Sequence, residues 1–213
     1  MNDTPILEHD KIDEENLKNE LTPHEFYKAL NQAIEQYENE GVILLEIPAE
    51  NYIHTNIDSM KSMVKNGFEG IYISFQRPFS NLSSLLKQQG VDLNKLFIID
   101  CATAFAGEKP YDNPRCISMS QDFEADEMVR TIRSTLSKLE GKNKFIFVDS
   151  LTTLAIHESV FETSRFIDLL IDSIKDNYSE SISFVFNVAK DLKQKVFIDN
   201  LMGYVDESIS LKA

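Results

Sequence analysis

An aspartate follows a short apolar run in the second half of the sequence and could take part in phosphate chemistry. The run is Phe145 to Val148, and Asp149 and Ser150 come directly after it. In enzymes that transfer phosphoryl groups, an aspartate at the end of a buried strand orients a magnesium ion beside the phosphates. The alternative is structural, because Asp and Ser side chains at a strand end also accept hydrogen bonds from the amides of a following loop or helix.

The residues that would grip a phosphate are missing from the expected place. A phosphate-binding loop needs glycines whose amides converge on the phosphate, a lysine to neutralise charge and a hydroxyl for magnesium. The sequence has no glycine between Gly41 and Gly67, and its Gly-Lys pair, Gly141 and Lys142, precedes a predicted strand instead of following one. The expected position holds Glu50 instead. At about 4 Å and an effective dielectric constant of about 20, its charge repels a phosphate charge by roughly 4 kcal/mol.

The other polar residues near predicted strand ends supply no evident reactive group. Gln76 stands at the end of the second predicted strand, and its amide has no useful basicity for general-base catalysis. Gln76 and Arg77 are interpreted either as a solvated strand end before a helix that starts at Pro78, or as a contact for an anion or a partner. Cys101 is predicted to be a neutral, packed thiol, because no histidine is placed near it as a base. His54 is interpreted as a surface or capping residue, with a ligand or pH sensor as the alternative.

The charge balance excludes the ordinary electrostatic route to nucleic acid and to anionic membranes. The 213 residues include 21 Lys and Arg against 35 Asp and Glu, a net charge of −14, which repels polyanions. The two cysteines and four scattered histidines form no ligand motif, so no metal site is predicted. The sequence has neither an apolar stretch of about 18 residues nor an evident export signal. We therefore expect a cytoplasmic protein with no membrane or nucleic-acid partner.

The apolar pattern places these side chains on a parallel sheet. Short, almost continuously apolar runs alternate with helical stretches, which is typical of a three-layer α/β fold with a mostly parallel sheet and helices on both faces. The predicted strands are 42–47, 70–75, 95–100, 144–149, 182–188 and 205–211, and the predicted helices are 22–40, 55–66, 79–89, 121–139, 159–176 and 191–201.

Ligands of such sheets bind beyond the carboxyl ends of the strands, where the sequence places Asp100, Asn187 and the residues named below. We therefore expect a ligand or partner cleft at that edge, with no catalytic residue and no metal ligand in it. The candidate cleft residues are Glu50, Asn51, Tyr52, Gln76, Arg77, Asp149 and Ser150.

The chain is predicted to divide into an acidic arm, residues 1–21, and a single domain, residues 22–213. The arm is sparsely apolar and is interpreted as a disordered solubilising tail or as a docking segment for a basic partner. Thr22 to Glu25 has the pattern of a capping box, with proline at the first helical position. Gly41 is expected to end the helix that starts there.

The order of these elements over about residues 40–211 resembles the ATPase domain of the RecA and KaiC superfamily. The likeness is carried by GIYISFQRPFSNLSSLLKQQGVDLNKLFIIDC, residues 70–101, and by FIFVDSLTTL, residues 145–154. It implies a RecA-like core in which Asp149 ends the Walker B strand and Gln76 replaces the catalytic glutamate.

Three shorter segments are similar to an archaeal family of uncharacterised KaiC-like proteins with a degenerate phosphate loop. They are Ile47-Pro48-Ala49-Glu50-Asn51-Tyr52, Ile99-Asp100-Cys101 and a predicted strand end from Asp149 to Leu154. This resemblance implies a retained fold and lost catalysis.

We therefore expect a non-catalytic RecA/KaiC-like module, a pseudo-ATPase without a cofactor, that acts through a protein partner. The docking alternative for the acidic arm makes that partner a basic one. The resemblance also allows a homo-oligomer, since RecA-like relatives commonly assemble through the sheet edge. Tyr52 is expected to fill the space that a nucleotide would occupy. One alternative is an unconventional nucleotide-binding protein or ATPase that uses Asp149, Arg77 and the amides of residues 48–55. A second is a small-molecule sensor that uses the same cleft.

Overall fold

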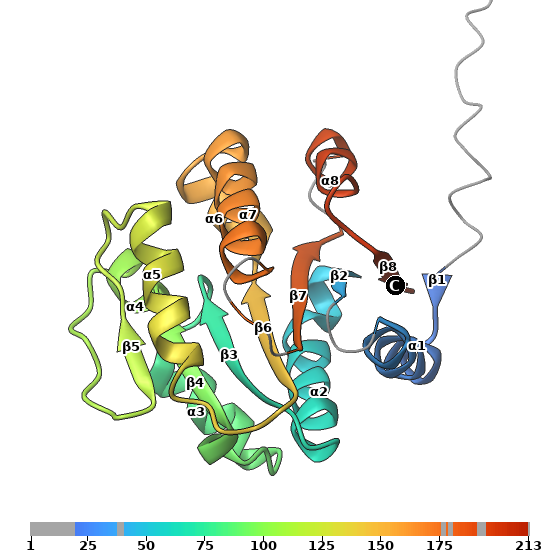
Figure 1. The fold of residues 1–213 in the computed structure, drawn as a ribbon, viewed down its shortest axis with the longest axis horizontal. Helices are drawn as coiled ribbons and strands as arrows, with labels where there is room; N and C mark the ends of the chain where they lie inside the picture. Colours follow the sequence, from blue (N-terminus) through green and yellow to red (C-terminus); the bar gives the residue numbers. More distant parts are fainter. Residues whose placement is uncertain (1–19, 38–40, 176–177, 179–180, 191–194, 213) are drawn as a thin grey trace, which may run out of the picture.

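Helices cover both faces of one parallel sheet in the computed structural model, which describes residues 20–37, 41–175, 178, 181–190 and 195–212 (Figure 1). All neighbouring strands of the sheet pair in parallel, in the order β1-β8-β2-β7-β6-β3-β4-β5. The strands are β1 (Glu20–Leu21), β2 (Val42–Ile47), β3 (Glu69–Ser74), β4 (Leu96–Asp100), β5 (Cys116–Ser118), β6 (Lys144–Asp149), β7 (Ile182–Ala189) and β8 (Glu207–Leu211). This is the three-layer, RecA-like α/β architecture that the sequence predicts.

The helices divide into two layers according to the core that each one helps to form. On one face of the sheet lie α1 (Pro23–Gln36), α2 (Tyr52–Lys65) and α3 (Phe79–Gln88). On the other face lie α4 (Ala102–Phe105), α5 (Ala125–Leu136), α6 (Leu151–His157), α7 (Val160–Lys175) and α8 (Lys195–Leu201). Two 3-10 turns, η2 (Ala49–Asn51) and η3 (Leu93–Lys95), join strands to helices.

Strand side chains alternate between the two cores, as the pleat requires. In β2, Leu44 belongs to the core that includes α5 and α7, whereas Ile43 and Leu45 belong to the core that includes α1 and α2. Because both faces of the central strands are buried, these strands are apolar throughout, and this is why their positions could be predicted.

The six predicted strands are confirmed to within two residues. The short elements β1, β5, α4 and α6 were not predicted, because two to seven residues are too few to show a period. Glu20 and Leu21, which were assigned to the acidic arm, pair with β8 instead. The rest of the predicted arm and residues 191–194 of the last predicted helix lie outside the described residues.

The start of α1 is confirmed, but its predicted end is wrong. The Glu25 amide donates to Thr22 Oγ1 at 3.5 Å, and the Thr22 amide donates to Glu25 Oε2 at 2.9 Å, which completes the capping box. The helix ends at Gln36 rather than at Gly41. A Cβ atom at Gly41 would lie 2.6 Å from Tyr37 Cβ, so this glycine permits close packing instead of capping the helix.

Gly70 in β3 allows the sheet to pack against an aromatic ring, and its replacement gives a first prediction. A Cβ atom there would lie 2.6 Å from the Phe145 ring, which is fully buried in β6. We expect Gly70→Ala to lower the free energy of unfolding by about 1–3 kcal/mol, because the ring has no space to move. In urea titrations, adding Phe145→Leu should make the Gly70→Ala substitution less costly than it is in the wild type. Equal costs in the two backgrounds would contradict this explanation.

Candidate functional site

The chain reverses its direction across the sheet between the neighbouring strands β2 and β7. After β2 the chain passes through α2 to β3, three places away, and after β7 it passes through α8 to β8 on the far side of β2. The helices α2 and α8 lie on opposite faces of the sheet. In open parallel sheets, such a reversal opens a crevice at the carboxyl ends of the two strands, and ligands bind there.

The turn after β2 is too tight to wrap around a phosphate. Pro48 leads into the single 3-10 turn Ala49–Asn51, and α2 begins at once with Tyr52. Glu50 is exposed in this turn, Asn51 is partly exposed, and the Asn51 carbonyl accepts a 2.9 Å hydrogen bond from Thr55 Oγ1. The turn therefore offers an exposed carboxylate where a phosphate-binding loop would offer converging amides.

Beneath this turn lies a cluster of buried polar side chains, which we call the buried polar cluster. It consists of Tyr52 and Asn56 from α2, Tyr72 from β3, Asp149 from the end of β6 and Asn187 from β7. The Tyr72 hydroxyl donates a hydrogen bond to Asp149 Oδ2, and Asn187 Nδ2 donates to Asn56 Oδ1 at 2.7 Å. The side chains of Tyr52 and Asp149 are thus brought together, with Tyr52 only 6% and Asp149 only 1% exposed.

Four polar atoms of this cluster are buried without a hydrogen-bond partner among the described residues. They are Tyr52 Oη, Asn56 Nδ2, Asp149 Oδ1 and Asn187 Oδ1. Native proteins leave few buried polar atoms unsatisfied, because each one costs about 1–3 kcal/mol. The cluster therefore concentrates polar groups inside an otherwise apolar core at the strand ends.

Burial is the largest influence on the pKa values of the titratable groups in this cluster. Desolvation raises the pKa of Asp149, and the nearby Tyr72, Tyr52 and Asn56 side chains and the Arg77 charge oppose that rise. Desolvation, followed by the Asp149 charge, also raises the pKa of Tyr52 and Tyr72 well above the usual value. Both phenols therefore remain neutral and can act as hydrogen-bond donors, but not as bases, near neutral pH.

Ser150 and Gln76 meet above Asp149, where they have structural roles. Gln76 Nε2 donates to Ser150 Oγ at 3.3 Å, and Ser150 Oγ accepts the Thr153 amide at 3.1 Å, which caps α6. The strand ends at Asp149, as predicted, and the segment from Ser150 to Leu154 that carries the family resemblance forms the N-cap and first turn of a helix. Arg77 is held through its backbone, since Ser74 Oγ donates to its carbonyl oxygen at 2.8 Å.

An open hollow of about 440 Å³ lies beside these residues, at the ends of β3 and β4. Gln76 and Arg77 line it together with Phe105 and His157, whose rings stack 4.0 Å apart. The other predicted cleft residues do not line this hollow. Tyr52, Asp149 and Ser150 are buried, while Glu50 and Asn51 belong to the turn before α2.

Asp100 at the end of β4 holds the starts of two neighbouring helices in place, and Cys101 directly after it is buried. The Asp100 carboxylate accepts hydrogen bonds from the Phe79 amide at 2.8 Å, the Thr103 amide at 2.9 Å and Thr103 Oγ1 at 2.6 Å. Burial and then the Asp100 charge raise the pKa of the Cys101 thiol well above its usual value. This thiol is therefore neutral and packed, as predicted.

Sequence reasoning missed Tyr72 and Asn56, and it placed Asn187 at the sheet edge without counting it among the candidate cleft residues. Tyr72 looks like an ordinary aromatic core residue of β3, and Asn56 looks like a surface residue of a helix. The signal that could have found the cluster is Asn187, an amide within the otherwise apolar run of β7. A buried amide needs polar partners from neighbouring elements.

The described residues offer neither a metal-ligand cluster nor a membrane-spanning helix. In this part of the chain, no group of three or more His, Cys, Asp or Glu side chains is arranged to hold a metal ion. None of the helices described is both long enough and apolar enough to cross a membrane.

Comparisons with known proteins identify the fold but no family. No family model matches the chain, and neither does any curated protein. Among solved structures, the chain is similar to the uncharacterized protein PH0321 from Pyrococcus horikoshii, crystallised in complex with an unknown peptide. The TM-score is 0.60 at 16% sequence identity, over 79% of this chain and 76% of PH0321. At this identity the likeness shows a shared α/β fold and nothing more.

Proposed function

We propose that the protein is a non-catalytic, RecA/KaiC-like binding module that recognises a protein partner and does not hydrolyse nucleotide. The observation that carries the proposal is the position of Tyr52. As the first residue of α2, it is buried beside Asp149. In a phosphate-binding fold of this kind, the amides at that helix start would face the phosphates.

The turn before Tyr52 supports the same conclusion. Its 3-10 conformation contains no glycine, and it presents the exposed Glu50 at the start of the helix. A carboxylate there interacts favourably with the positive end of the helix dipole. It therefore competes with a phosphate for the same place.

Asp149 is also unsuited to orient a metal ion. Its side chain is 1% exposed, and Oδ2 accepts the Tyr72 hydroxyl. Magnesium dehydrates reluctantly and usually keeps several waters. A hydrated ion would need the cluster to open, so the retained aspartate alone does not support catalysis.

The proposal of a protein partner has two supports. PH0321, which shares the fold, was crystallised with a peptide. The net charge of −14 favours partners with basic surfaces through electrostatic complementarity. A homo-oligomer and a cytoplasmic location remain predictions from the sequence.

The melting temperature in the presence of Mg-ATP tests this proposal. A ligand that binds the folded state at 100 times its dissociation constant stabilises it by about 2.7 kcal/mol. We expect no shift at millimolar Mg-ATP, relative to magnesium alone. A shift that Asp149→Asn abolishes would instead support the nucleotide-binding alternative and would overturn the pseudo-ATPase proposal.

A further inference from the structure

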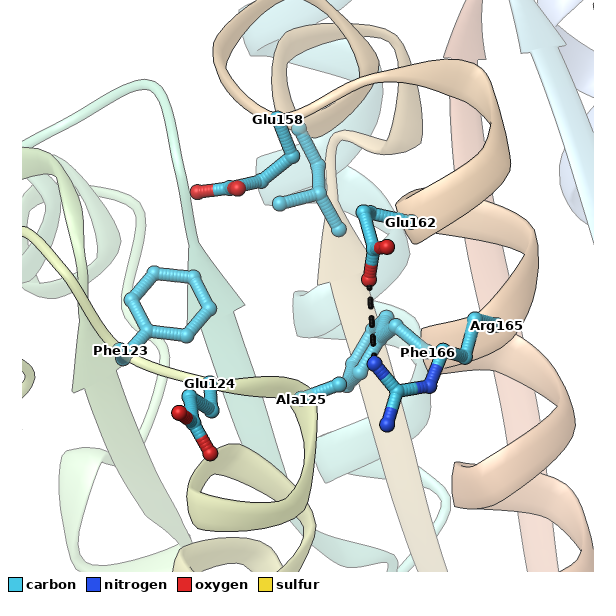
Figure 2. A pocket seen from close by; sticks show the side chains of 8 residues that line it. Phe123, Glu124, Ala125, Glu158, Glu162, Arg165 and Phe166 are labelled. Carbon is cyan, nitrogen blue, oxygen red and sulfur yellow. Dashed lines mark hydrogen bonds and ion pairs between the residues drawn. The ribbon is translucent and has the colours of Figure 1, made fainter.

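A second pocket, of about 360 Å³, lies between the start of α5 and the corner formed by α6 and α7, next to the hollow at the strand ends (Figure 2). Its apolar lining comes from Phe123, Leu154 and Phe166, which are all buried in the core beneath it. These side chains are fixed by core packing, so the floor of the pocket is preformed.

Carboxylates surround this apolar floor. Glu124, Glu158 and Glu162 line the pocket, and Figure 2 shows the Glu158 carboxylate extending over it on the side of Phe123. Within the described part of the chain, neither Glu124 nor Glu158 forms an ion pair. Both side chains are exposed and are therefore available to a positively charged partner.

Arg165 shows that this rim already holds a guanidinium group. Its side chain is 52% exposed, and its nitrogens lie 3.4 Å from Glu162 Oε2 and 3.5 Å from Asp126 Oδ2. Exposed pairs at these distances contribute about 0–1 kcal/mol, so a partner can displace them at little cost. Two carboxylates share Arg165, while Glu124 and Glu158 have no cationic partner among the described residues, so the rim keeps an excess of negative charge.

The corner next to the pocket exposes large apolar side chains. Phe161 is 73% and Ile156 63% exposed, and Val160 is also exposed. Ile156 and Val160 are each two positions from Glu158 in the sequence, and Phe161 is next to Glu162. Exposed apolar groups surrounded by polar residues mark protein interaction sites.

We propose that this pocket binds a segment of a protein partner in which an apolar side chain is flanked by Lys or Arg residues. The apolar side chain packs between Phe123 and Phe166, and the flanking cations face Glu124 and Glu158. The inference rests on the proposed function, because it names the partner chemistry of the binding module. The acidic N-terminal residues of this chain and nucleic acids carry the wrong charge for this rim.

The probe is a fluorescein-labelled peptide in which two leucines are flanked on each side by two arginines, titrated with the full chain and followed by fluorescence anisotropy. We expect saturable binding, and at least about tenfold weaker binding when glutamates replace the arginines. Glu158→Lys should weaken binding by about tenfold or more, and Phe161→Ser should weaken it by a smaller factor.

The matched control is Glu35→Lys, which makes the same charge change at an exposed site of α1 on the opposite face of the sheet. It should bind the peptide like the wild type, apart from a small effect of net charge. Melting temperatures within the error of the wild type would show that all three variants are folded.

Absence of saturable binding, or equal weakening by Glu35→Lys and Glu158→Lys, would overturn the inference. If the peptide binds but only Gln76 or Arg77 substitutions weaken it, the pocket is wrongly assigned while the binding module stands. A melting shift with Mg-ATP that depends on Asp149 would overturn the proposed function independently of the peptide result.

Discussion

Replacing Asp100 with alanine is expected to lower the free energy of unfolding by about 3–5 kcal/mol. The buried carboxylate accepts three hydrogen bonds, two from Thr103 and one from the Phe79 amide. It therefore joins the starts of α3 and α4 to the end of β4. Each buried donor that loses its acceptor costs about 1–3 kcal/mol, and hydrogen bonds to charged groups are among the stronger ones.

Equilibrium unfolding in urea measures this loss, with Asp100→Asn as the conservative comparison. The asparagine keeps one oxygen acceptor in the same place, so we expect it to lose clearly less stability than alanine does. If Asp100→Ala costs less than about 1 kcal/mol, Asp100 does not organise these two helix starts.

The second large effect concerns Asp149, whose replacement by asparagine is expected to stabilise the protein near neutral pH. Burial raises the pKa of Asp149 in the folded state, so the charged form is disfavoured there relative to the unfolded chain. Asparagine keeps an oxygen that can accept from Tyr72 and has no charge to desolvate. We expect a gain of about 1–3 kcal/mol.

The stability difference between Asp149→Asn and the wild type should depend on pH in one direction. Below the unfolded pKa, near 4, the carboxyl group is protonated in both states and costs no charge burial. As pH rises from there towards the raised folded pKa, the unfolded state binds fewer protons than the folded state, and the wild type loses stability. The advantage of Asp149→Asn should therefore grow over this window and stay constant above it.

Tyr72→Phe provides the complementary measurement, because it removes the hydroxyl that donates to Asp149. We expect a loss of about 2–3 kcal/mol in the wild type and a smaller loss in the Asp149→Asn background. A stability gain from Asp149→Asn that does not change with pH, or an equal cost of Tyr72→Phe in both backgrounds, would contradict a buried carboxylate held by Tyr72.

The sheet could be predicted from the sequence because its strands are apolar on both faces. Runs such as Lys144–Asp149 and Ile182–Ala189 are buried in nearly every residue, and a long helix follows or precedes them. The edge strands could not be predicted in this way. Cys116–Ser118 has three residues, all only partly buried, and no periodic signal distinguishes it from a loop.

The sequence predicted at which edge of the sheet the candidate site lies, but not the contacts within it. Strand ends brought Gln76 and Ser150 together, and the packed state of Cys101 followed from its surroundings. The pairing of Tyr72 with Asp149 depends on the order of strands β3 and β6, which are far apart in the sequence but adjacent in the sheet. Periodicity along one strand contains no information about that neighbour, so the buried polar cluster needed the structure.

The pocket near Phe123 could not be predicted for the same reason, because its residues come from elements that are separate in the sequence. Glu124 precedes α5, while Glu158 and Glu162 stand at the corner between α6 and α7, so each looks like an ordinary surface acid in the sequence. Only the packing of α5 against α7 brings these acids around one apolar floor.

Steady-state phosphate release from Mg-ATP by the purified full chain tests the central claim most directly. If Tyr52 and the turn before it have replaced the phosphate site, the wild type should release phosphate no faster than Asp149→Asn at any protein concentration. Phosphate release that rises in proportion to the wild-type protein and is lost in Asp149→Asn would show that the protein hydrolyses ATP, and would contradict the account.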